Sequence, residues 1–154
     1  MKKILFVMFA ALAFVACDKD DYIIRKEQPY VLINWGEDCK YVNDNVERKK
    51  YPYLDVQNGG EVKFTTSVDV FFPALEIYDK EGNKVGKYSY KKTDTEWNFE
   101  IGVIKKIGEC SYKIEGFPNN SDNYKCLAIY VHSIDEKVDA NSMVVFLDEN
   151  ALIE

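Results

Sequence analysis

The chain has 154 residues, of which 26 are acidic and 20 are basic, so it carries a net charge of −6. This length is enough for one ordinary domain with its own hydrophobic core. The acidic balance disfavours binding to phosphate backbones, so we expect no nucleic-acid partner. Beyond the N-terminus, no apolar run approaches the roughly 20 residues that span a bilayer.

The first 16 residues are organised like a signal peptide. Two lysines precede an uncharged apolar run from Ile4 to Phe14, which suits the core of a secretory signal but is short for a membrane span. The run ends in Phe14-Val15-Ala16-Cys17, which resembles the lipobox of bacterial lipoproteins, with Phe14 where that family usually has Leu. The resemblance implies that residues 1–16 are removed and that Cys17 carries lipid. Ordinary secretion, with cleavage after Ala13, is the alternative.

The residues after Cys17 are Asp18-Lys19-Asp20-Asp21. They resemble the acidic tag that exports lipoproteins to the outer face of the outer membrane in one Gram-negative lineage. The resemblance implies an outer-membrane protein that meets the membrane through its N-terminal lipid and lies at the cell surface. A position on the periplasmic face is the alternative. Residues 17–28 are then a charged, lipidated tether.

Residues 29–154 show a regular succession of strand signals. Short segments rich in β-formers or in alternating polar and apolar residues are separated by turn residues such as Asn58-Gly59-Gly60 and Asp79–Asn83. We expect strands over Tyr30–Trp35, Tyr53–Val56, Glu61–Thr66, Leu75–Tyr78, Val85–Tyr90, Glu96–Ile104, from Gly108 through Ile114, Tyr124–Ile134 and Ser142–Leu147.

Residues 36–52 have no clean period and are expected to form a long loop, with a helical turn near 45–49. The pattern as a whole predicts an all-β protein with a single antiparallel β-sandwich, Ig-like or jelly-roll-like. Leu75–Asn83 and Gly108–Ile114 resemble a hairpin and a later strand with glycine and tyrosine in Ig-like or pre-peptidase-type bacterial β-sandwiches. That resemblance implies a fold and no activity.

The sequence contains no pattern that predicts catalysis. His132 is the only histidine, and it lies inside a predicted strand on the face opposite Val131, where a structural role is the usual one. The spacing of Asp79, Glu81 and Asn83 fits a hairpin turn better than a calcium loop. No Cys-x-x-Cys pair occurs. We therefore expect no enzyme, no cofactor and no bound metal.

Three cysteines follow Cys17 in the chain: Cys39, Cys110 and Cys126. If a direct turn joins the strands on either side of residues 116–120, then Cys110 lies opposite Cys126 and the two can form a disulfide. A bridge to Cys39 and three unpaired thiols are the alternatives.

The predicted loop 36–52 and its borders hold the candidate ligand-binding residues, which are aromatic or basic: Trp35, Tyr41, Arg48, Lys49, Lys50, Tyr51 and Tyr53. Aromatic rings give contact area at low entropic cost, and basic groups bind carboxylates, so this set suits an anionic glycan or an acidic protein patch. The alternative is that the rings belong to the core and that the charges form a solvated turn.

Taken together, the sequence predicts a non-catalytic cell-envelope lipoprotein that serves as a binding or accessory module for a glycan or protein ligand. A structural or assembly subunit of an outer-membrane complex is the second hypothesis, and a small hydrolase is the third. A strip of exposed aromatic residues would favour glycan binding. A bare apolar edge strand would favour assembly by strand addition.

Overall fold

A computed structural model describes residues 29–44, 46–118 and 123–150. These residues form strands and turns, and they include no helix that could cross a membrane. The strands are β1 (Ile33–Trp35), β2 (Lys40–Asp44), β3 (Lys49–Tyr53), β4 (Glu61–Thr66), β5 (Val70–Phe71), β6 (Ala74–Asp79), β7 (Lys84–Ser89), β8 (Glu96–Phe99), β9 (Gly102–Gly108), β10 (Ser111–Gly116), β11 (Tyr124–Ser133) and β12 (Asn141–Phe146).

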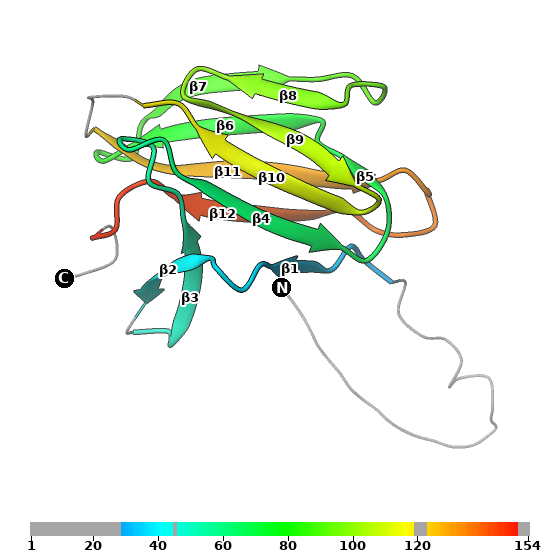
Figure 1. The fold of residues 1–154 in the computed structure, drawn as a ribbon, viewed down its shortest axis with the longest axis horizontal. Helices are drawn as coiled ribbons and strands as arrows, with labels where there is room; N and C mark the ends of the chain where they lie inside the picture. The colour runs from blue at the N-terminus through cyan, green and yellow to red at the C-terminus, as the bar shows by residue number, and fades with distance from the viewer. Residues whose placement is uncertain (1–28, 45, 119–122, 151–154) are drawn as a thin grey trace.

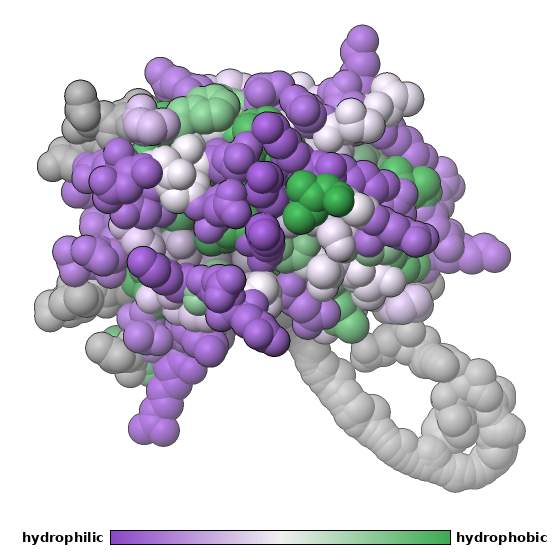
Figure 2. All heavy atoms as spheres, in the orientation of Figure 1, coloured by the Kyte–Doolittle hydropathy of each residue, from purple (hydrophilic) through white to green (hydrophobic). Residues whose placement is uncertain are grey.

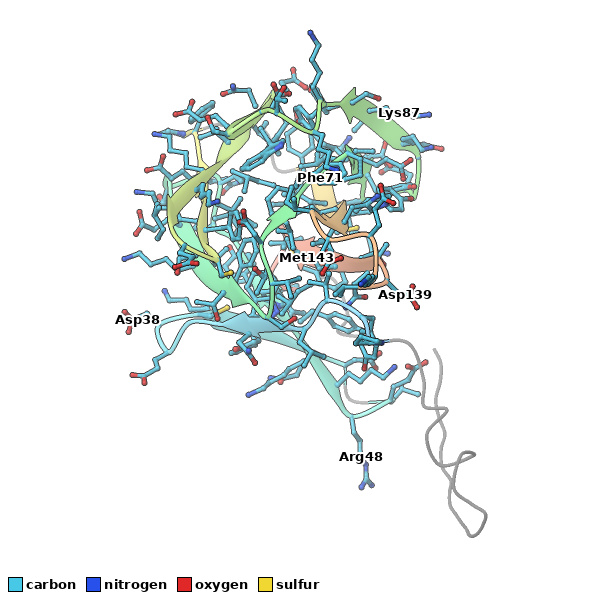
Figure 3. All side chains as sticks on the ribbon, turned by 90° about the vertical axis from the view of Figure 1, so that its right-hand side faces the viewer. Asp38, Arg48, Phe71, Lys87, Asp139 and Met143 are labelled. Atoms are coloured by element: carbon cyan, nitrogen blue, oxygen red, sulfur yellow. The ribbon has the colours of Figure 1, made fainter. Side chains whose placement is uncertain are left out.

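The strands form two packed sheets, which confirms the predicted all-β sandwich (Figure 1). One sheet has five strands in the order β1-β4-β10-β9-β8. The other has seven, in the order β2-β3-β12-β11-β6-β7, with β5 paired to β11. The strand pairings are antiparallel except that of β3 with β12. Figure 3 shows the two layers edge-on, with side chains filling the space between them.

Strict alternation of residue type explains why strands were predicted at the positions of β4 and β10. In β4 the side chains of Val62, Phe64 and Thr66 are buried and the three that alternate with them are exposed. In β10 the buried positions are Tyr112, Ile114 and Gly116. Because successive side chains of a strand point to opposite faces, such a pattern fixes which face of each strand meets the other sheet.

The prediction of a long loop over residues 36–52 is wrong, because β2 and β3 form a hairpin there. Only Val42 and Pro52 of its two strands are buried, so the hairpin has little of the alternation that identifies strands. Its turn is closed by the Asp44 carboxylate, which accepts the N–H groups of Val46 at 3.0 Å and Glu47 at 3.1 Å. Arg48 takes a left-handed conformation at φ 59°, and no helical turn forms among the described residues.

The predicted single strand Glu96–Ile104 is also wrong, since it is two strands that turn back on each other. Trp97, Phe99, Ile101 and Val103 are all buried, and their alternation continues through the turn and hides it. Gly102 starts β9 at a place where a Cβ would collide with the backbone oxygen of Glu115. The close approach of neighbouring strands therefore requires glycine there.

Most other predicted strands differ from the observed ones at their ends, by one residue in four of them and by more in the three that follow. The first strand is shorter than Tyr30–Trp35 and occupies only Ile33–Trp35. Tyr53–Val56 is not a strand of its own, since Tyr53 ends β3. Gly108 ends β9 rather than opening the next strand, and Cys110 lies in the turn before β10 with φ 55°.

A buried aromatic cluster occupies the centre of the core. Phe72 lies between β5 and β6, and its ring meets Trp97 at 4.7 Å, Tyr112 at 5.3 Å and Phe64 at 6.0 Å between centroids. These contacts are edge-on, the arrangement that aromatic quadrupoles favour. The Tyr112 hydroxyl accepts the N–H of Val70 at 3.2 Å and donates to the Asp69 carboxylate at 3.1 Å. Burial raises the pKa of Tyr112 to about 12.

We expect Tyr112→Phe to lower the free energy of unfolding by about 1–3 kcal/mol, because it leaves the buried Val70 N–H without its acceptor. Urea denaturation followed by tryptophan fluorescence measures the change. Tyr30→Phe is the matched control, since Tyr30 is 54% exposed and should change stability by less than about 0.5 kcal/mol. Equal stability of the Tyr112→Phe variant and the native chain would contradict the role given to this hydroxyl.

Candidate functional site

The outward face of the five-stranded sheet carries alternating lysine and glutamate side chains. Lys105 pairs with Glu115 at 3.1 Å, Lys113 with Glu115 at 3.3 Å, and Lys113 with Glu61 at 3.8 Å. Figures 1 and 2 view the molecule from this side, where hydrophilic side chains cover most of the surface. Partly exposed pairs of this kind add little stability. Their charged groups make this face a hydrated surface.

The outward face of the seven-stranded sheet has a different composition. We name as the outer face the residues of β6, β11 and β12 that alternate with core side chains: Glu76, Tyr78, Cys126, Ala128, Tyr130, His132, Ser142, Val144 and Phe146. Their neighbours on the same strands, such as Ile77, Ile129 and Val145, belong to the core. The outer face is thus built mainly of aromatic and small residues, and Glu76 is the one acidic member of the set.

Glu76 is only 8% exposed although it lies on an outward face. Its Oε1 accepts hydrogen bonds from the hydroxyls of Tyr78 at 2.7 Å and Tyr130 at 3.4 Å. Its Oε2 lies 3.1 Å from Nζ of Lys84 on β7. The hydrogen bonds from Tyr78 and Lys84 hold the pKa of Glu76 below its usual value despite burial. The carboxylate therefore stays ionised at neutral pH and fixes two tyrosine rings.

A second group of rings lies at the far end of β11. His132 is exposed and its ring meets that of Phe71 edge-on at 5.6 Å, while Nζ of Lys92 lies 5.7 Å from the Phe71 centroid. The predicted position of His132 opposite buried Val131 is confirmed. Among residues 29–44, 46–118 and 123–150, no group of three or more His, Cys, Asp or Glu side chains is placed to hold a metal ion.

The structure brings four of the sequence-predicted binding residues together on the β2–β3 hairpin. Tyr41 and Lys50 face each other across the hairpin, with the ammonium 4.4 Å from the ring centroid. Lys49 is exposed and pairs with Glu47 at 3.4 Å. Arg48 lies in the turn and points away from the domain (Figure 3).

The other three predicted residues are partly buried in packing contacts. Trp35 belongs to β1, in the other sheet, and packs on Phe64 with centroids 5.2 Å apart. Tyr51 meets Phe146 edge-on at 5.4 Å. Tyr53 ends β3 and is partly buried, and burial raises its pKa. The predicted set therefore divides into a hairpin surface and residues that attach the hairpin to the sandwich or fill the core.

The register that led to a Cys110–Cys126 disulfide is wrong. It required β10 and β11 to be hairpin partners, whereas β10 pairs with β4 and β9 and β11 pairs with β5, β6 and β12. The strands β10 and β11 instead belong to different sheets. Cys39, Cys110 and Cys126 are all free, and burial raises the pKa of Cys39 and of Cys126, so neither is a thiolate at neutral pH.

Sequence reasoning missed the outer face as a candidate site. A signal was present in Tyr124–Ser133, where Cys126, Ala128 and Tyr130 alternate with three fully buried aliphatic residues. A strand that is apolar on one face and small or aromatic on the other has no ordinary solvent face. Only the pairing of β11 with β6 and β12 shows that these residues adjoin Glu76 and Val144.

Comparison of the chain with models of protein families, with curated proteins and with solved structures finds no match. The candidate sites therefore depend on the geometry described above.

Acid should destabilise the protein partly through Glu76. Because its folded-state pKa lies below the unfolded value of about 4.3, its contribution is present above that value and is lost as the pH falls through the folded-state pKa. Glu76→Gln should therefore lose less stability between pH 7 and pH 3 than the native chain does, measured by urea denaturation. Glu136→Gln, which removes an exposed loop carboxylate, should keep the native pH dependence. A native-like pH profile for Glu76→Gln would disprove this assignment.

Proposed function

We propose that this chain is a non-catalytic, lipid-anchored protein of the cell envelope, and that its β2–β3 hairpin binds an anionic ligand, either an acidic glycan or an acidic patch of a protein. The observation that supports the proposal is a basic, aromatic hairpin that extends from the sandwich of an otherwise acidic chain (Figure 1).

The hairpin is attached to the sandwich at one end only. β3 pairs with β12 through the single residue pair Tyr53 and Phe146, next to which the N–H of Leu54 donates to the carbonyl of Phe146 at 2.9 Å. Tyr51 adds its ring contact with Phe146. Beyond this point β2 and β3 pair only with each other, so the tip can approach a partner without a clash from the rest of the domain.

The charges near the tip favour an anionic ligand. The Asp44 carboxylate is occupied by backbone N–H groups of the turn, and Glu47 is paired with Lys49. Arg48 and Lys50 are exposed, and an arginine fork can bind a carboxylate with two parallel hydrogen bonds. Tyr41, with Lys50 over its ring, supplies a flat surface beside these charges.

The triple variant Tyr41→Ala, Arg48→Ala, Lys49→Ala tests the hairpin. On an array of acidic and neutral glycans, supplemented with a glutamate-rich peptide, the native chain should bind an acidic probe more weakly as salt rises. The variant should lose at least about tenfold in affinity, since 1.4 kcal/mol is one such factor. Lys87→Ala, Lys91→Ala is the control for loss of charge. Absence of binding to every acidic probe, or undiminished binding by the folded triple variant, would overturn the proposal.

The proposed anchor depends on residues that lie outside the described part of the chain. Cys17→Ala should abolish lipid labelling and move the protein from the membrane fraction to the soluble fraction, because the variant lacks the residue that would carry the acyl chains needed for stable attachment. Unchanged membrane fractionation of Cys17→Ala would contradict lipidation.

Replacement of Lys19, Asp20 and Asp21 by Ala tests the surface location, since protease added to intact cells should degrade the native chain and spare this variant.

The edges of the sheets favour a binding module over assembly by strand addition. β2 and β7 are the edge strands of the seven-stranded sheet, and they carry Lys40, Lys84 and Lys87. Lysine on an edge strand discourages pairing with another chain. At the β8 edge of the five-stranded sheet, two tyrosines bind the backbone, with Tyr90 donating to the Asn98 carbonyl at 2.6 Å and Tyr88 accepting the Glu100 N–H at 3.0 Å.

A further inference from the structure

We infer that the outer face of the seven-stranded sheet is a second binding site, and that it takes an uncharged saccharide chain on the rings of Tyr78 and Tyr130. This site is separate from the hairpin and does not depend on the proposed binding of an anionic ligand there.

The two rings are held in place by one carboxylate. Glu76 lies opposite Ala128 in the register, Tyr78 lies opposite Cys126, and extension of the same register places Tyr130 beside Ala74. The tyrosines therefore flank Glu76 from opposite directions along the strands, and both hydroxyls converge on its Oε1. A ring fixed at its base by the sheet and at its tip by a hydrogen bond loses little entropy when a ligand stacks on it.

Burial of this carboxylate on an outward face needs an explanation. Removing a charge from water costs free energy unless hydrogen bonds and an opposite charge replace the water. On the other sheet, the glutamates of the outward face remain partly exposed beside their lysines, as the 29% and 46% exposed side chains of Glu115 and Glu61 show. The Glu76 side chain is 10% exposed. We attribute the lower exposure of Glu76 to its role in orienting the rings of Tyr78 and Tyr130.

The chemistry of the face selects the class of ligand. Glu76 is paired with Lys84, and Lys87 lies opposite Glu76 in the register of β6 with β7, so the one acid of the outer face is already balanced by lysines. An uncharged sugar presents C–H groups that stack on aromatic rings, and hydroxyls that can donate to a carboxylate or accept from an ammonium. A tyrosine with one face in water and its tip fixed is suited to such a ligand, and Tyr130 is 39% exposed.

The shape of the face favours a chain over a single sugar. Ala128, Ser142 and Val144, the smaller side chains of the outer face, lie beside the two rings in the register of β11 with β12. Further along β11, His132 and Phe71 continue the row of rings. An extended polymer can lie along this line, whereas a monosaccharide would reach only one part of it.

Affinity gel electrophoresis of the full-length chain tests the inference. The probes are four uncharged polysaccharides, namely a mixed-linkage β-glucan, a galactomannan, a dextran and an arabinoxylan, and two acidic ones, polygalacturonate and a sulfated galactan. We expect at least one uncharged probe to retard the chain, with a dissociation constant that is unchanged between 50 mM and 500 mM salt.

Tyr130→Ala and Tyr78→Ala should each weaken that retardation at least tenfold, because each removes a stacking ring. Tyr130→Phe keeps the ring and should retain most of the binding, while the hairpin triple variant should bind uncharged probes as the native chain does. Circular dichroism checks that every variant is folded. Retardation by none of the uncharged probes, retardation by acidic probes alone, or native binding by the folded Tyr130→Ala variant would each overturn the inference.

Discussion

The packing of Phe72 against Phe64, Trp97 and Tyr112 is the interaction on which the rest of the fold depends. Phe72 lies where the chain, after leaving the five-stranded sheet at β4, joins the seven-stranded sheet through β5 and β6. The Tyr112 hydroxyl holds the same crossover through Val70 and Asp69. The cluster therefore fixes where β6 lies beside β11, and with it the position of Glu76 next to the ring of Tyr130. The indole N–H of Trp97 is buried without a hydrogen-bond partner among the described residues. The free energy gained by burying the ring therefore outweighs the cost of this unpaired donor.

The outward faces of the two sheets carry different kinds of side chain. Lysines and glutamates cover the five-stranded sheet, where partly exposed pairs cost little and attract water. In the seven-stranded sheet, β6, β11 and β12 instead place rings, small residues and one nearly buried carboxylate outward, and β7 adds Lys84 and Lys87 beside them. The two outward faces of the sandwich therefore differ in chemical character.

The hairpin and the outer face adjoin each other through Phe146. The ring of Tyr51 lies against Phe146 from the hairpin, and Cys126 and Tyr78 continue the same cross-strand row through β11 and β6. The free Cys126 thiol lies in this row, so its moderate burial is a consequence of the neighbouring rings rather than of a disulfide.

The sequence by itself determined the strands in which residue type alternates strictly, such as Glu61–Thr66, and from their number it determined the sandwich class, because a period of two needs no information from distant residues. It could not reveal the turn at Glu100 and Ile101, because the alternation of buried residues runs through it, nor the β2–β3 hairpin, which has few buried side chains. The pairing of strands was decided only by the tertiary structure. The strands β10 and β11 lie in different sheets instead of forming a hairpin, a choice set by contacts of the aromatic core between residues far apart in the chain, such as Phe72 and Tyr112. That choice separates Cys110 from Cys126 and places Glu76, Tyr78 and Tyr130 together.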